Sequence, residues 1–177
     1  MNSRITWICL TATVAVAHGH ATTYHSVASA QQACFPEGVK FTAADVKLTR
    51  EQTKAIEKAS GTPLRQETQR VWKAMQNDQF VGWFLVDEVI GKHELITYAL
   101  ALNPKGSIKS IEVMDYRENY GGEIRQADWR VQFVGKKPGD KLKLEDDIKN
   151  ITGATLSCRH ITEGVKRLLS FYELVLK

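Results

Sequence analysis

Three closely spaced segments rich in β-branched and aromatic residues place the strongest constraint on the fold. They are QFVGWFLVDEVI at 79–90, LITYALAL at 95–102 and SIKSIEVMDY at 107–116. Residues of these types are favoured in β-strands. The sequence Asn-Pro-Lys-Gly at 103–106 is typical of a turn, so the second and third segments are predicted to form a hairpin. The apolar residues of the third segment do not alternate strictly, a pattern compatible with a β-bulge.

Helical patterns occur before and after these strands. Ser26–Phe35 has a helical composition, and Thr49–Ser60 begins with a threonine and a glutamine three residues later, the spacing of a capping box. Gly61 then stands where a helix C-terminal cap is expected. Ser157–Leu176 carries apolar residues at three- and four-residue spacings, which predicts a helix with one apolar face. Without a linker or a break in composition, residues 22–177 are predicted to form a single α+β domain, an antiparallel sheet with flanking N-terminal and C-terminal helices.

The first 21 residues have the pattern of a secretory signal peptide. Arg4 precedes a short apolar run, Ile5–Ala17, and small residues then allow cleavage after Ala17 or after Ala21. The run is shorter than the roughly 17–25 residues that a transmembrane helix needs. We therefore expect residues 1–21 to be a signal peptide and the mature chain to be exported without an integral membrane span; the alternative is that the run is kept as an uncleaved anchor.

Charge and cysteine content exclude some classes of protein. The net charge of +4 is spread along the chain, so it does not indicate nucleic-acid binding. Only Cys34 and Cys158 lie outside the predicted signal, and the sequence leaves open whether they form one disulfide or remain two separate thiols. Cys158 and His160 alone do not supply the four ligands of a structural zinc site.

The segment most informative about function is a run of small and hydroxyl residues directly before the last helix. It reads Thr152, Gly153, Ala154, Thr155, Leu156 and Ser157. The glycine and alanine allow a ligand to approach the backbone closely, and free amides at a helix start favour an anion such as phosphate. The same six residues could equally form an ordinary helix N-cap with a tight turn, because Ser and Thr are preferred caps.

This segment resembles the hallmark of the FMN-binding domain family, Ser/Thr-Gly-Ala-Thr. The family includes the covalent-flavin subunits of the sodium-translocating NADH:quinone oxidoreductase and of Rnf-type complexes, as well as small periplasmic electron carriers. Other segments resemble the family in the same order along the chain: Cys34–Pro36, Val81–Trp83, Gly91–Tyr98, Tyr116–Gly122 and Trp129–Lys136.

The resemblance implies a cofactor, a tether and partners. FMN would be attached by a phosphoester to Thr155, installed by a flavin transferase that uses FAD and Mg²⁺. The chain would carry electrons between membrane or periplasmic redox partners, in the periplasm or on the outer face of the cytoplasmic membrane. A flavin-free module that only binds partner proteins is the alternative. The family often has an aspartate six residues before the acceptor threonine, where this chain has Lys149, so covalent and non-covalent attachment both stay open.

The remaining cofactor-binding residues are expected to surround that phosphate and the flavin ring. The loop 116–122 is the candidate for the ring edge, because two adjacent glycines permit close backbone approach. Glu118 could accept a hydrogen bond from the flavin or be a solvated loop carboxylate, and Trp129 is expected to be a buried structural aromatic rather than a stacking partner. His93 is expected on an edge strand, and Arg159 either beside the phosphate or on the exposed face of the last helix. The predicted cofactor-binding set is Thr152, Gly153, Ala154, Thr155, Leu156, Ser157, Glu118, Tyr120, Gly121 and Gly122.

Overall fold

The computed structural model describes residues 22–118 and 120–177, and its centre is an antiparallel sheet. The predicted signal peptide lies outside the described residues. The strands follow one another across the sheet in the order β1-β7-β6-β5-β4-β2, with β3 also paired to β4. Their bounds are β1 Thr22–Thr23, β2 Lys40–Ala43, β3 Val46–Lys47, β4 Thr68–Gln76, β5 Gln79–Ile90, β6 Leu95–Leu102 and β7 Ile108–Tyr116.

The three predicted strands are therefore confirmed as β5, β6 and β7, and the hairpin joins β6 to β7. The β6–β7 pairing shifts register twice, once between Thr97 and Tyr98 and once between Ala101 and Leu102. These irregularities correspond to the imperfect alternation of the third segment. The preceding β4–β5 hairpin turns at Asn77 and Asp78, both of which have positive φ, the geometry that a two-residue hairpin turn prefers.

The described part of the chain forms four α-helices around the sheet: α1 Val27–Cys34, α2 Arg50–Ser60, α3 Ala127–Arg130 and α4 Thr155–Phe171. Shorter helical turns are η1 Gly122–Arg125, η2 Val131–Phe133 and the π-helical η3 Tyr172–Leu176. The capping box of α2 is present, since the Thr49 hydroxyl accepts from the Gln52 N–H and the Gln52 side chain accepts from the Thr49 N–H. Gly61 ends α2 in the left-handed conformation. Helix α4 starts at Thr155, two residues before the predicted start, so the first turn includes the hallmark threonine.

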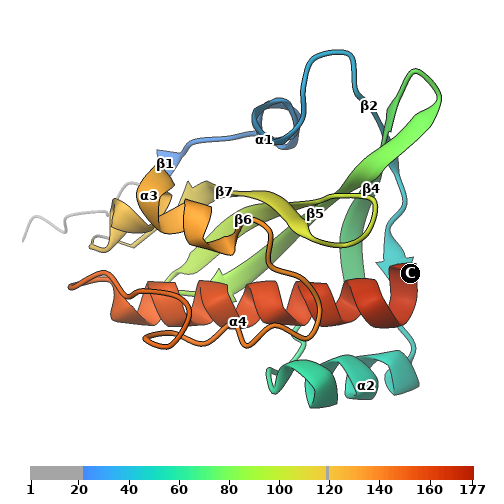
Figure 1. Cartoon of the computed structure of the whole chain (residues 1–177). Coiled ribbons are helices and arrows are strands. Elements are labelled where there is room, and N and C mark those ends of the chain that lie inside the picture. Colours follow the sequence, from blue (N-terminus) through green and yellow to red (C-terminus); the bar gives the residue numbers. More distant parts are fainter. Residues whose placement is uncertain (1–21, 119) are drawn as a thin grey trace, which may run out of the picture.

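Both faces of the sheet are covered by helices. Figure 1 shows α4 running along one face with α2 beyond it, and α1 on the other face. Along β5, Leu85 packs in the cluster with α4 whereas Phe84 packs in the cluster with α1, as alternation along a strand requires. Cys34 belongs to the α1 cluster and Cys158 to the α4 cluster. Both are buried free thiols, so the open alternative is resolved in favour of two separate thiols.

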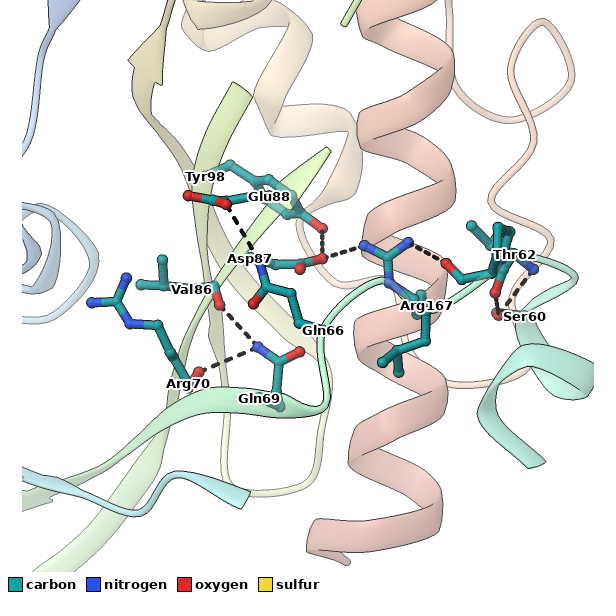
Figure 2. Close-up of polar contacts among 12 residues, drawn as sticks. Ser60, Thr62, Gln66, Gln69, Arg70, Val86, Asp87, Glu88, Tyr98 and Arg167 are labelled. Atoms are coloured by element: carbon teal, nitrogen blue, oxygen red, sulfur yellow. Dashed lines mark hydrogen bonds and ion pairs between the residues drawn. The ribbon is translucent and has the colours of Figure 1, made fainter. Parts of the chain in front are cut away.

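A buried ion pair fixes α4 against the sheet. Arg167 of α4 donates to the Asp87 carboxylate of β5 at 2.6 Å, and the hydroxyl of Tyr98 donates to the same oxygen at 2.9 Å (Figure 2). Gly164 permits the close approach, because a Cβ there would lie 2.4 Å from the Tyr98 hydroxyl. The position of α4, and with it the position of its N-terminus, is thus set by polar as well as apolar contacts. Within residues 22–118 and 120–177, none of the helices combines the length and the apolar character needed to cross a membrane.

Candidate functional site

The site is built around the first turn of α4. Gly153 has a φ of +89°, a left-handed conformation that favours glycine, and no atom lies within 4 Å of where its Cβ would be. The N-cap residue is Ala154, and no side chain caps the helix. Cys158 is the first residue whose N–H bonds back into the helix, to Ala154 O at 2.9 Å. The amides of 155–157 thus have no side-chain cap, and the first turn has no acidic residue, an arrangement that favours an anion.

This finding argues against the ordinary N-cap interpretation of the hydroxyl-rich segment. An ordinary N-cap would use a Ser or Thr oxygen to accept from the first-turn amides. Here the cap position holds an alanine, whose methyl group cannot accept a hydrogen bond. Thr155 and Ser157, which carry the nearest hydroxyls, are instead residues of the first helical turn.

The loop after β7 packs directly on this helix start. Gly121 also has a φ of +89°, and a Cβ there would lie 2.7 Å from the Tyr116 hydroxyl and 3.2 Å from the Ala154 Cβ. Tyr116 donates its hydroxyl proton to the Tyr120 carbonyl, and its oxygen lies 3.3 Å from the Ser157 Oγ. Burial raises the pKa of Tyr116, which keeps this donor protonated. Two motifs that are far apart in the sequence are thereby held together.

The turn between β5 and β6 forms a third wall, clamped by Glu118. One carboxylate oxygen of Glu118 accepts from the backbone N–H groups of His93 at 2.5 Å and Glu94 at 2.9 Å. A Cβ on Gly91 would come within 2.7 Å of the same oxygen, so the glycine makes room for the clamp. Desolvation acts to raise the pKa of Glu118, but these backbone hydrogen bonds outweigh it and lower the pKa. The prediction that His93 lies on an edge strand is wrong, because β5 ends at Ile90 and β6 starts at Leu95.

These three walls line an open cavity of about 640 Å³. Ligand sites commonly have volumes of about 300–1,000 Å³. Eight of the ten predicted cofactor-binding residues line the cavity, whereas Thr152 and Gly122 do not. Three further lining residues were missing from the predicted set. The full lining is Lys92, His93, Glu118, Tyr120, Gly121, Glu123, Gly153, Ala154, Thr155, Leu156 and Ser157.

The chemistry of the cavity differs from one part to another. Tyr120, which is 86% exposed, and Leu156, which is 39% exposed, add accessible aromatic and apolar surface to the lining from two different walls. The first-turn amides offer hydrogen-bond donors to an anion, and the lining also includes one positive charge, Lys92, and two carboxylates, Glu118 and Glu123. The cavity therefore suits a ligand that has a flat apolar body and an anionic end.

Residues near the cavity have identifiable structural roles. Trp129 is buried, packs edge-to-face on Phe133 and donates its indole N–H to the Lys149 carbonyl at 2.8 Å, so the expectation of a structural aromatic is confirmed. Arg159 is on the exposed face of α4 and lines a neighbouring cavity of about 580 Å³ that also includes Thr155. The Nδ1 of His160 lies 2.5 Å from the Ile90 carbonyl oxygen, at the end of β5.

Comparison with protein families gives a match that includes the residues lining this cavity. A family model described as "FMN-binding domain" matches residues 91–170. The matched range contains every wall of the cavity, from the β5–β6 turn to α4. It begins at Gly91, so the resemblance of 34–36 and 81–83 stays a prediction. Comparison with curated proteins gives no significant match.

Proposed function

We propose that this chain, whose residues 91–170 match the FMN-binding domain family, is an exported flavoprotein that carries electrons, with FMN joined to Thr155 by a phosphoester. FMN as the cofactor follows from the family match. The phosphoester to Thr155, the electron-transfer role and the assignment of the site residues are what we propose. Its principal support is that Thr155 begins α4 at the wall of the 640 Å³ cavity, among first-turn amides that no side chain caps.

The described residues fit the chemistry of FMN. The open space at Gly153 leaves room for a phosphate beside the backbone, and the amides of the first turn would donate to the phosphate oxygens. Tyr120 and Leu156 would contact the isoalloxazine ring, since both present apolar surface to the cavity. Glu118 would act indirectly, by holding the β5–β6 turn that forms a wall of the site.

When bound, FMN supplies one- or two-electron transfer chemistry, and the protein tunes its potential. A phosphoester leaves the ring unmodified, so any tuning must come from the residues around it. The carboxylates of Glu118 and Glu123 line the cavity and would oppose the gain of negative charge on the ring. We therefore expect these two residues to lower the reduction potential of the flavin.

We further propose that residues 1–21 direct export and that the mature chain, 22–177, acts in the periplasm or on the outer face of the cytoplasmic membrane. The support is the charged, apolar and small-residue pattern of the N-terminus. Maturation would need a flavin transferase, and function would need membrane or periplasmic redox proteins as electron donor and acceptor.

The test is to export the chain from a bacterium that also expresses a flavin transferase. The wild-type protein should be yellow and should keep flavin fluorescence after denaturing electrophoresis, and Thr155→Val should lose that fluorescence. Thr42→Val is the matched control, because Thr42 is exposed on β2, outside the cavity, and its variant should keep the signal. A colourless wild type would favour the flavin-free, partner-binding alternative, and a flavin lost on denaturation would contradict the tether.

A further inference from the structure

The chain segment before the hallmark is held in place by α3 and η2. The Lys149 N–H donates to the Gln132 side chain at 2.7 Å, and the Lys149 carbonyl accepts from Trp129 at 2.8 Å. The Lys149 side chain itself is exposed. The backbone at this position is thus fixed through both of its polar groups, which determines where the next residue, Asn150, can point.

Asn150 directs its amide to the hydroxyl of Thr155. Its Nδ2 lies 3.0 Å from the Thr155 Oγ1 and 3.4 Å from a carboxylate oxygen of Glu145. An ionised carboxylate only accepts hydrogen bonds, so the amide nitrogen rather than the amide oxygen must face Glu145. It follows that Asn150 donates to Thr155, and that the hydroxyl proton of Thr155 points away from Asn150.

The oxygen of the Asn150 side-chain amide makes no hydrogen bond within the described residues. Asn150 Oδ1 is buried and has no hydrogen-bond partner among residues 22–118 and 120–177. A buried acceptor without a donor is costly.

From this geometry we propose that Asn150, oriented by Glu145, positions the Thr155 hydroxyl for flavin transfer. The inference rests on the proposed function. In that reaction the Thr155 Oγ1 forms a bond to the flavin-side phosphorus of FAD, the phosphorus–oxygen bond to the AMP half breaks, AMP leaves and the hydroxyl proton is released. Asn150 occupies one acceptor site of Oγ1 and holds it in a single direction. It touches neither substrate nor leaving group in that step, so it is a positioning residue.

The test measures flavin transfer with purified flavin-free acceptor, a flavin transferase, FAD and Mg²⁺. Initial rates of adduct formation, read from in-gel fluorescence and intact mass, are determined as a function of acceptor concentration. Asn150→Ala should lower kcat by about 10- to 100-fold, because loss of orientation alone can have effects of this size. KM for the acceptor should change by less than about twofold, since recognition of the acceptor surface is retained.

A matched control comes from the β6–β7 turn. Asn103 Nδ2 donates to the Ser107 Oγ at 3.0 Å, the same kind of contact over the same distance but away from the cavity. Asn103→Ala should leave kcat unchanged. Asn150→Asp keeps the shape of the side chain and, when ionised, cannot donate, so its kcat should be low at neutral pH and recover as the pH falls and the carboxyl becomes protonated. Repulsion between Glu145 and the ionised side chain of this variant would also weaken as the pH falls, so denaturant titrations over the same pH range are the control, and a positioning role requires that folding does not follow the profile of kcat.

The outcomes separate the two proposals. A wild-type chain that forms no adduct overturns the tether and the positioning role together. A wild-type chain that forms the adduct while Asn150→Ala retains its kcat overturns the positioning role alone. A loss confined to KM also overturns it, because the side chain would then serve recognition by the transferase. If Asn150→Ala fails to fold in denaturant titrations, the pH profile of Asn150→Asp decides.

Discussion

Substitution of Gly121 by alanine tests whether the loop after β7 packs on the start of α4 as described. The residue has a φ of +89°, and the left-handed region costs a non-glycine residue about 1–2 kcal/mol. The new methyl group would also lie 2.7 Å from the Tyr116 hydroxyl and within 3.3 Å of two atoms of Ala154. Inserting a methyl group into a packed region adds about 1–3 kcal/mol. The free energy of unfolding should therefore fall by about 2–5 kcal/mol.

Gly139 supplies the matched control, because its φ is +92° and no atom lies within 4 Å of its Cβ position. Gly139→Ala should lose only the conformational part, about 1–2 kcal/mol. Denaturant titrations of both flavin-free variants, followed by tryptophan fluorescence, give the comparison. Gly121→Ala should also lower flavin incorporation, because two walls of the cavity would be displaced, whereas Gly139→Ala should not. Equal losses of stability in the two variants would refute the described packing.

Three further predictions concern the charges and thiols. Asp87→Asn should lower the free energy of unfolding by about 3–5 kcal/mol in denaturant titrations, because it leaves Arg167 buried without its counter-ion; a loss below about 1 kcal/mol would argue against a buried pair. The pKa of Glu118 is lowered in the folded protein, so its stabilising effect is complete above its ordinary value near 4.5 and disappears as the pH falls through the folded value. Between neutral and acid pH, the free energy of unfolding should therefore fall less in Glu118→Gln than in the wild type. An equal fall in the two proteins would contradict the role of Glu118 as a clamp. Burial raises the pKa of Cys34 to about 11, so alkylation of the native protein near neutral pH should be slow at Cys34. Because Cys34 and Cys158 are free thiols, a reducing agent should leave the melting temperature unchanged. A melting temperature that shifts with reductant would indicate a disulfide.

Local patterns in the sequence predicted those parts of the fold that depend on local physics. The capping box and the terminal glycine of α2 are satisfied within the helix and its flanking residues, so they can be recognised without knowledge of the rest of the structure. The strands β5, β6 and β7 follow from their β-branched and aromatic residues. The hallmark segment was expected directly before a helix that starts at Ser157, whereas the helix starts at Thr155, and its alanine cap and uncapped amides required the structure.

Contacts between distant segments could not be predicted in this way. Glu118 clamps a turn 25 residues away, and Arg167 pairs with a carboxylate 80 residues away. An isolated glutamate or arginine in a sequence is most often a solvated surface residue, so no local pattern distinguishes these two. The same reason explains why Lys92, His93 and Glu123 were missed as cavity residues, since only the folding of their loops brings them to the start of α4.

The most direct test of the central claim is peptide mapping of the mature, exported protein after co-expression with a flavin transferase. Trypsin cleaves after Lys149 and Arg159 and so releases residues 150–159, which include the hydroxyls of Thr152, Thr155 and Ser157. Our account predicts that this peptide carries the mass of an FMN phosphoester and that fragmentation places it on Thr155. An unmodified peptide, or an adduct on a different residue, would contradict the account.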